Sequence, residues 1–372
     1  MSTETSQVRP QHSADKSASV VAVTGAASGV GHILLQRLLA AQDSGLIGTI
    51  VAIDDHCGPT EGVTWRVADI RDPALAPRLS DVDVLVHAAD DRSLDAPARE
   101  RRTRNVRAAQ TLLTAAAAER VSRVILITST MVYGATPENP VPLPEDAPMA
   151  PDTDAGVIGD FIEIEDLASF ARRAHPALSV TVLRPAPLVG PEIDTLLARH
   201  FSAPRLLTVK GWEQAWQFCH IDDLASAVEF VIVHDVHGKT GTVAVGCEGA
   251  LRQSDAEEIA ELRRFELPAN LALGATQRLH RVGLAPAPAS ELKFLVYPCV
   301  VDCVTLRDAG WQPEYDNAEA LGALLEARGK QSRGRNVGRK EVTITAASAA
   351  GAAAAAIGTA AAVRRLRKRR RS

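Results

Sequence analysis

Short apolar runs alternate with longer amphipathic stretches through the first half of the chain. The runs SVVAV (19–23), GTIVAIDD (48–55) and RVILITST (123–130) are apolar along most of their length and rich in β-branched residues. Between them, HILLQRLLAA (32–41) and NVRAAQTLLTAAAAE (105–119) place apolar residues at helical spacing. Apolar strands that alternate with helices are typical of a parallel sheet covered on both faces. The pattern predicts an α/β fold with a doubly wound parallel sheet.

A glycine-rich turn joins the first predicted strand to the first predicted helix. In VAVTGAASGVGHIL (21–34), Gly25 permits a tight turn, Gly29 lets backbone N–H groups approach a pyrophosphate, and Gly31 allows close packing of the helix. The strand before it and the helix after it are the context that a dinucleotide-binding turn requires. A glycine loop that only packs is the alternative. The predicted cofactor-binding turn consists of Gly25, Ala27, Ser28, Gly29, Val30 and Gly31.

Two acidic residues at the end of the second predicted strand bear on the choice of cofactor. Asp54 closes that strand and Asp55 follows it. A carboxylate at this position accepts hydrogen bonds from ribose hydroxyls and repels a 2′-phosphate. The sequence therefore predicts NAD in preference to NADP.

Further motifs continue this pattern along most of the chain. Beside VTGAASGVG (23–31) they are ADIRD (68–72), VHAAD (86–90), RNVRAAQTLL (104–113), ITSTMVYG (127–134), LRPAPLVGP (183–191), FCHIDDLASAV (218–228) and VDCVTLRDAGWQPEY (301–315). Together they resemble the extended branch of the short-chain dehydrogenase/reductase superfamily, which includes NAD-dependent epimerases and dehydratases. The resemblance covers roughly residues 19–329. More distantly, the chain is similar to actinobacterial relatives of UDP-glucose 4-epimerase.

The resemblance implies a domain organisation. Residues 19–190 would form a Rossmann-type NAD-binding domain, and 191–329 a smaller, mixed substrate lobe. Within that lobe, 217–250 and 298–310 would return to the Rossmann core. We predict that residues 1–18, which lack the apolar stretch of a signal peptide, are a disordered leader.

The resemblance also implies roles for individual residues. A hydroxyl that steadies a developing oxyanion would come from Ser129 or Thr130, and Tyr133 belongs to the V-Y-G motif beside it. The implied cofactor contacts beyond Asp54 and the glycine turn are Asp69 and Ile70 beside the adenine, Ala88 and Ala89 under the cofactor, and Asn105, Arg184 and Pro185.

A catalytic pair that the resemblance leads us to expect is missing. Family members carry Y-x-x-x-K on a helix after the V-Y-G motif, with lysine lowering the pKa of the tyrosine that acts as base. Here the window reads GDFIEIEDLASF (159–170), and the best register places Gly159 and Glu163 at the two positions. Glu163 can bond ribose hydroxyls, but its like charge would raise the pKa of a phenolate. The standard proton relay is not expected.

Several substitutes for this pair stay open. Tyr133 is one, and a desolvated Asp160 or Glu163 with a raised pKa is another. The alternative is that the four acids of this stretch, including Glu165 and Asp166, line a solvated helix face or a dimer interface. The substrate is also open, because Pro187 replaces the asparagine with which the family contacts a sugar nucleotide.

The charge of the chain is divided unevenly. The net charge is −4, but residues 330–372 hold twelve Lys or Arg and a single acid, Glu341. Within this tail, 342–363 is an uncharged, alanine-rich stretch of 22 residues. We predict a surface-lying or disordered helix that contacts an anionic membrane surface or another acidic partner, with a membrane anchor as the alternative. Specific nucleic-acid recognition is not expected.

Two hypotheses remain. The five cysteines show no metal-ligand spacing, so no metal site is predicted, and they favour a cytoplasmic protein. The resemblance implies a homodimer. The first hypothesis is an NAD-linked epimerase, dehydratase or oxidoreductase with a rewired acid–base group. The second is a non-catalytic NAD-binding sensor or scaffold that docks through its basic tail.

Overall fold

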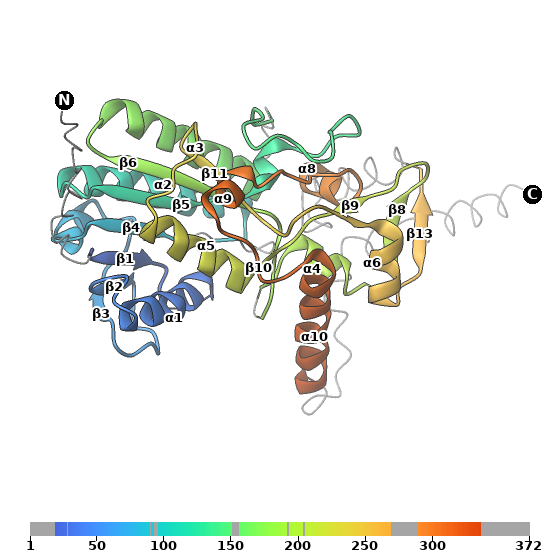
Figure 1. The fold of residues 1–372 in the computed structure, drawn as a ribbon, viewed down its shortest axis with the longest axis horizontal. Helices are drawn as coiled ribbons and strands as arrows, with labels where there is room; N and C mark the ends of the chain where they lie inside the picture. The colour runs from blue at the N-terminus through green and yellow to red at the C-terminus, as the bar shows by residue number, and fades with distance from the viewer. Residues whose placement is uncertain are drawn as a thin grey trace, which may run out of the picture.

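A seven-stranded parallel sheet forms the centre of the molecule. The structure is a computed structural model, and it describes residues 19–27, 29–89, 91–92, 96–150, 156–191, 193–203, 205–268 and 289–335. The strand order is β11-β6-β5-β4-β1-β2-β3, and all neighbouring strands are parallel (Figure 1). The strands are β1 (Val21–Thr24), β2 (Ile50–Asp54), β3 (Thr64–Val67), β4 (Val84–His87), β5 (Arg123–Ile127), β6 (Ser179–Pro185) and β11 (Thr242–Val245). The predicted doubly wound, Rossmann-type sheet is confirmed.

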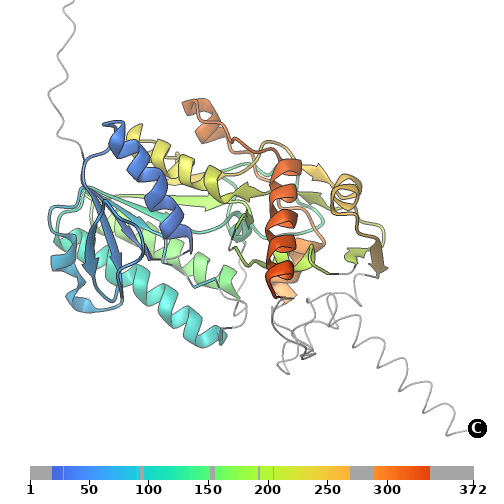
Figure 2. The ribbon, with the colours of Figure 1, turned by 90° about the horizontal axis from the view of Figure 1, so that it is seen from below.

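Helices cover both faces of this sheet. α1 (Gly29–Asp43) packs with α5 (Ile221–Val233) on one face, and α2 (Ala98–Ala118) packs with α3 (Val157–Ala174) on the other (Figure 2). The short helix η1 (Pro73–Leu79) packs against α2. Because both faces are covered, β1, β4 and β5 are buried along their whole length, as unbroken apolar runs predict.

A smaller lobe lies beyond the carboxyl ends of the strands (Figure 1). Within the described residues it contains short strand pairs. β7 (Leu188–Val189) pairs in parallel with β10 (Cys219–His220), and β8 (Leu206–Val209) pairs in parallel with β13 (Arg264–Leu267). β9 (Ala215–Trp216) pairs antiparallel with β12 (Leu251–Arg252). The chain returns from the lobe to the main sheet through α5 and β11, and the predicted domain boundaries stay predictions. The remaining elements are η2 (Thr130–Tyr133), α4 (Leu196–His200), α6 (Gln253–Ala260), α8 (Ala289–Leu292), η3 (Lys293–Leu295), α9 (Val304–Ala309) and α10 (Asn317–Arg335).

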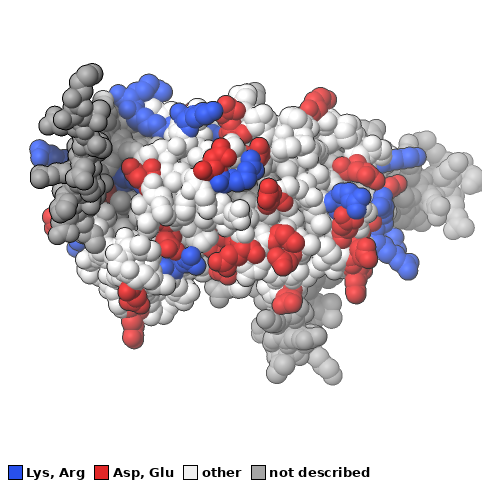
Figure 3. Space-filling view, viewed as in Figure 1, with Lys and Arg blue, Asp and Glu red and all other residues white. Residues whose placement is uncertain are grey.

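Charged side chains and apolar helices bear on possible contacts of the surface. Acidic and basic side chains are interspersed on the face shown in Figure 3. Across the described ranges, no helix combines the length and the apolar character needed to span a membrane. The leader (1–18) and most of the basic tail (336–372) lie outside the described residues. The predictions made for them, including tail docking, stay predictions.

The core of the lobe encloses a histidine. His200, the last residue of α4, is 2% exposed and packs beside the rings of Phe201 and Trp216. Neither of its ring nitrogens has a hydrogen-bond partner among the described residues. Burial lowers the pKa of this imidazole from 6.5 to about 4. His200 is therefore neutral in the folded protein at pH values where a solvated histidine takes up a proton.

We expect His200 to make the fold acid-sensitive. The unfolded chain takes up a proton here as the pH falls through 6.5, and the folded chain does so near pH 4. Above pH 6.5 this residue therefore does not lower the free energy of unfolding. As the pH falls below 6.5 the free energy of unfolding decreases, by about 2 kcal/mol between pH 7.5 and pH 5. In urea unfolding of His200→Leu at pH 7.5 and pH 5, the difference in the free energy of unfolding between the two pH values should be smaller by this amount.

The matched control is His175→Leu, because His175 is exposed at the end of α3. It should leave the pH dependence of unfolding as in the parent protein. A His200→Leu variant with the parent's pH dependence would show that this interpretation is wrong.

Candidate functional site

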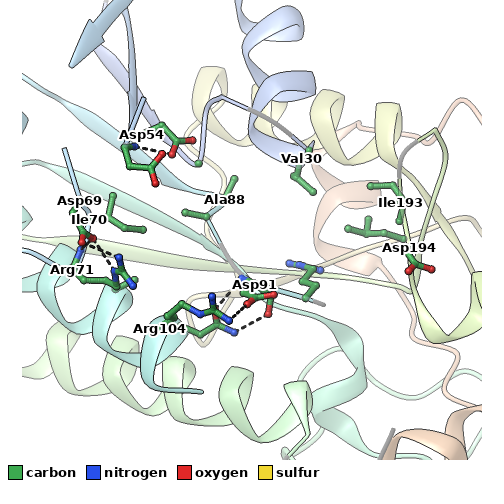
Figure 4. A pocket seen from close by; sticks show the side chains of 18 of the residues that line it. Val30, Asp54, Asp69, Ile70, Arg71, Ala88, Asp91, Arg104, Ile193 and Asp194 are labelled. Carbon is green, nitrogen blue, oxygen red and sulfur yellow. Dashed lines mark hydrogen bonds and ion pairs between the residues drawn. The ribbon is translucent and has the colours of Figure 1, made fainter. Parts of the chain in front are cut away.

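A groove of about 780 Å³ runs along the carboxyl ends of the parallel strands. It crosses the point between β1 and β4 at which the strand order reverses, where ligands of open α/β sheets bind. Figure 4 shows Asp69 and Ile70 toward one end, Ala88 between, and Ile193 and Asp194 of the lobe at the other end. The predicted cofactor contacts that line it are Gly25, Gly29, Val30, Asp54, Asp69, Ile70, Ala88, Ala89 and Asn105.

The glycine turn has the geometry that its spacing predicts. Gly25 has φ +68°, and a Cβ on it would lie 2.6 Å from the Cα of Ala89. A Cβ on Gly31 would lie 2.0 Å from the carbonyl oxygen of Gly25, so α1 packs directly on the turn. Gly29 has φ +56° and faces open space, with no atom within 4 Å of a Cβ built there. This open floor at the first turn of a long helix fits a pyrophosphate.

Asp54 connects the turn to the second strand. Its carboxylate accepts hydrogen bonds from the backbone N–H of Ala27 at 2.9 Å and of Asp55 at 2.8 Å. A carboxylate has about four acceptor positions, so oxygen lone pairs remain for ribose hydroxyls. Ala27 and Gly31 support the turn from behind the groove, and Ser28 lies outside the described residues.

The groove also contains a cation that the sequence pattern did not single out. Arg71 donates through Nε at 2.8 Å and through Nη2 at 2.9 Å to the two oxygens of Asp69. This hydrogen bond is the main reason why the pKa of Asp69 is lowered. Arg71 follows β3, and neighbouring parallel strands end at the same edge of the sheet. From this rule, the sequence could have predicted that Arg71 lies near Asp54 and Asp55.

The loop after β4 is held by α2. Asn105 accepts from the backbone N–H of Asp91 at 2.9 Å and donates to the Asp91 carbonyl at 3.0 Å. Arg104 pairs with the Asp91 carboxylate at 2.6 Å (Figure 4). Asn105 also donates to the carboxylate of Asp160 on α3 at 3.2 Å. Asn105, which the resemblance placed among the cofactor contacts, thus ties the floor of the groove to two helices.

The acids of α3 do not all lie on a solvated face, so that prediction is wrong for two of them. Asp160 is 0% exposed and pairs with Arg101 of α2 at 2.9 Å. Glu165 is 3% exposed, accepts from Nε of Arg184 at 3.1 Å, and accepts from the hydroxyl of Thr128 at 2.7 Å. Buried carboxylates require such partners, and the sequence alone does not show which distant residues supply them.

The other two acids are on the outer part of the helix. Glu163 pairs with Arg102 of α2, with both side chains partly exposed, and Asp166 is exposed. Glu163 is not among the residues that line the groove. Burial raises the pKa of Asp160, as a carboxylate base would need, but Arg101 and Asn105 hold it and it does not line the groove either.

The hydroxyl groups near the groove differ in their availability. Ser129 accepts from the backbone N–H of Met131 at 3.2 Å and donates to the carbonyl of Pro185 at 3.3 Å. Thr130 is buried. Tyr133 donates its hydroxyl to the carbonyl of Glu145 at 2.5 Å, and burial raises its pKa to about 12. At neutral pH Tyr133 is therefore a protonated donor that is already engaged.

Arg184 and Pro185 support the site from behind. The guanidinium of Arg184 lies 4.7 Å above the centre of the Tyr133 ring while it pairs with Glu165. Leu188 of the motif LRPAPLVGP also lines the groove, and residues outside the motifs that line it include Arg92, Ile193, Asp194 and Arg199. The last three belong to the lobe, where the sequence lacks a regular apolar pattern.

A family model matches most of the described chain. Its description is "NAD dependent epimerase/dehydratase family", and it matches residues 21–246. This chain belongs to the NAD dependent epimerase/dehydratase family. The membership confirms the resemblance inferred from the motifs, and it places the glycine turn, the V-Y-G motif and α3 inside the matched region.

Known relatives agree with this membership. An uncharacterised protein of Mycobacterium tuberculosis strain H37Rv is 32% identical over 327 residues, which cover 83% of this chain and 84% of that protein. A UDP-glucose 4-epimerase of Thermotoga maritima is similar in structure, with a TM-score of 0.62 at 17% identity over 84% of this chain and 99% of that one. The dTDP-glucose 4,6-dehydratase DesIV of Streptomyces venezuelae has a TM-score of 0.62 at 21% identity over 85% and 98%. At these identities the two structures show the fold alone.

We expect the Glu165–Arg184 pair to be essential for stability. Glu165→Leu leaves the buried guanidinium of Arg184 without its carboxylate and should lower the free energy of unfolding by about 3–5 kcal/mol. The double variant Glu165→Leu/Arg184→Met removes both charges and should recover most of that loss. Urea unfolding of the parent and these variants measures both effects.

The matched control lies two residues away on the same helix. Glu163→Leu breaks the exposed pair with Arg102 and should cost less than about 1 kcal/mol. Equal losses for Glu163→Leu and Glu165→Leu would contradict the distinction between the two faces of α3.

Proposed function

We propose that this protein binds NAD in the groove and acts on a hydroxyl or keto group of a sugar nucleotide or a related substrate. The open floor at Gly29, beside the Asp54 carboxylate, is the observation that carries the proposal. Its family membership supports it. The similar structures support it as well, since the Thermotoga maritima epimerase was solved with UDP-glucose and DesIV with NAD.

The residues present fit the pyrophosphate and the adenosine half of a dinucleotide. Gly29 and Val30 line the place where a helix N-terminus would receive the pyrophosphate. Asp54 would accept hydrogen bonds from the adenosine ribose, and Ile70 offers an apolar surface for the adenine. When bound, NAD supplies a hydride acceptor at the substrate carbon.

The chain's own residues would then have to bind the substrate oxygen and move its proton. Ser129 is the hydroxyl that we assign to the substrate oxygen, because it follows the carboxyl end of β5. Tyr133, Thr130 and Glu163 are weaker candidates. Tyr133 is engaged by Glu145, Glu163 faces Arg102, and Thr130 is 0% exposed against 5% for Ser129, whose own hydroxyl donates to the Pro185 carbonyl. We therefore propose a non-standard acid–base group in place of the tyrosine–lysine pair.

Other parts of the proposal extend beyond the groove. We propose a cytoplasmic homodimer whose basic tail contacts an anionic surface or an acidic partner. The charge of the tail supports the docking part, since residues 364–371 contain seven Lys or Arg.

Calorimetric titration of the full chain with NAD and NADP tests the cofactor assignment. We expect micromolar binding of NAD and binding of NADP at least about tenfold weaker, since the carboxylate of Asp54 would face the 2′-phosphate. A panel of nucleotide sugars, with NADH absorbance followed, tests turnover. Turnover that survives Ser129→Ala unchanged would contradict the assignment of Ser129.

The same experiment separates the two hypotheses. Binding together with turnover supports an enzyme with a substitute catalyst. NAD binding without turnover on the panel favours a sensor or scaffold, because the helix that should carry tyrosine and lysine carries neither. Failure to bind either nucleotide would show that the cofactor assignment is wrong.

Substitution of Asp54 tests the choice between the two nucleotides. Asp54→Ala should weaken NAD binding by about tenfold, the cost of charged hydrogen bonds to ribose, and should weaken NADP binding much less. The ratio of the two dissociation constants is the deciding readout, because loosening of the Ala27 turn would affect both nucleotides alike. Asp43→Ala, at the exposed end of α1, is the control and should leave the ratio unchanged.

A further inference from the structure

A second cavity adjoins the end of the groove at which Asp69 lies. It has a volume of about 400 Å³ and lies between the loop that leads from β3 into η1 and the middle of α2. Its charged lining residues are Asp69, Arg71, Asp72, Arg104 and Arg107. Three of these residues, Asp69, Arg71 and Arg104, also line the groove, so the two spaces are neighbours. The proposed binding of NAD leaves this cavity without a role.

Three arginines from two elements meet in the cavity. Arg71 follows β3, whereas Arg104 and Arg107 lie about one turn apart on α2. Residues three positions apart on a helix are neighbours, and like charges at that spacing repel each other. An anion held between the two guanidinium groups of α2 would replace this repulsion by attraction.

The carboxylates that line the cavity already have partners. Asp69 accepts from Nε of Arg71 at 2.8 Å and from its Nη2 at 2.9 Å (Figure 4). Asp72 caps the short helix η1, where its carboxylate accepts from the backbone N–H of Ala74 at 2.8 Å. Neither carboxylate forms an ion pair with an arginine of α2 in the part of the chain that the structure describes.

The arginines of α2 retain donors on this side. Arg104 pairs with the Asp91 carboxylate of the groove at 2.6 Å, and its Nε is buried without a hydrogen-bond partner among the described residues. Arg107 is exposed and makes no hydrogen bond or ion pair with any described residue. The hydrogen bond from Arg71 is the main reason why the pKa of Asp69 is lowered, and the charge of Arg107 contributes to it. Arg107 is therefore close enough to act on the cavity.

The number of guanidinium groups indicates the kind of anion. A carboxylate is satisfied by one guanidinium fork, as Asp69 is by Arg71. A phosphate group has at least three acceptor oxygens that point in different directions, so several guanidinium groups can share it. Three arginines that reach one cavity from two elements therefore fit a phosphate better than a carboxylate.

We propose that this cavity binds a phosphate group that is not part of the cofactor, either as the free ion or on a small phosphorylated molecule. Arg107 supplies the charge that no ion pair neutralises, and Arg71 and Arg104 line the cavity beside it. The site is separate from the glycine turn, because Gly29 lines the groove and not this cavity. The inference does not rest on the proposed binding of NAD.

Titration of the full chain with inorganic phosphate and with phenyl phosphate tests the proposal. Binding is followed by phosphorus NMR, and chloride keeps the ionic strength constant so that screening does not change. Arg107→Met should weaken both ligands by about fivefold, the loss of a partly exposed charge contact, and the reversed charge of Arg107→Glu should remove binding. Equal affinities for the two ligands would indicate the free ion, and tighter binding of the ester would indicate a phosphorylated molecule.

The matched control is Arg99→Met, because Arg99 is an exposed arginine of the same helix that does not line the cavity. It makes the same change in charge and should leave both affinities unchanged. Arg107→Gln is a second uncharged variant and should weaken both ligands if Arg107→Met folds poorly. Thermal unfolding of each variant reports on folding, and phosphate should raise the midpoint of the parent.

The two nucleotides separate the cavity from the groove. Saturating NAD should leave the affinity for phosphate within about twofold. Displacement of phosphate by NAD would place the ion at the glycine turn, and displacement by NADP alone would assign the cavity to the 2′-phosphate of a cofactor. Either result would overturn the proposal.

The remaining outcomes are equally decisive. Absence of phosphate binding in the parent would overturn the proposal, as would unchanged affinity in the Arg107 variants or an equal loss in Arg99→Met. If the parent binds phosphate in a manner that depends on Arg107 but binds neither nucleotide, the NAD assignment fails and this inference stands.

Discussion

Two buried carboxylates on α3 constrain the arrangement around the groove. A carboxylate taken out of water must be met by a cation and by hydrogen-bond donors, or the helix cannot pack. Glu165 meets Arg184 of β6, and Asp160 meets Arg101 of α2. Asn105 adds a hydrogen bond to Asp160 and, with its remaining groups, fixes the loop after β4. The shape of the groove thus depends on charge pairs that lie behind it.

This constraint accounts for the contacts on the buried side of α3. Its buried side presents Asp160, Phe161 and Glu165, and each has a partner on a neighbouring element. Arg184 joins a second network, because its guanidinium also lies over the ring of Tyr133. Asp160 and Glu165 are held by ion pairs behind the groove, which argues against a role for these two carboxylates in proton transfer.

Much of the fold could be predicted from the sequence because local chemistry determines it. Apolar runs and helical spacing predicted the sheet and its covering helices, and the glycines at 25, 29 and 31 predicted the turn. The acids of α3 were misjudged because burial depends on partners far away in the chain. Arg101 is 59 residues from Asp160 in sequence, and a helix that carries four acids reads as solvated until that partner is known. Arg92 was missed for the same reason, since its contacts lie 35 and 36 residues away.

One lysine performs two tasks in the family pattern that the motifs resemble. That lysine holds a ribose and lowers the pKa of a neighbouring tyrosine. This chain has no lysine on α3 to hold a ribose. It has no tyrosine on α3 to activate, and the phenol of Tyr133 is buried, bonded to Glu145 and raised to a pKa of about 12. Cofactor binding and acid–base chemistry depend on different atoms of the site, so the loss of the tyrosine–lysine pair does not by itself remove the glycine turn and Asp54, on which the first depends.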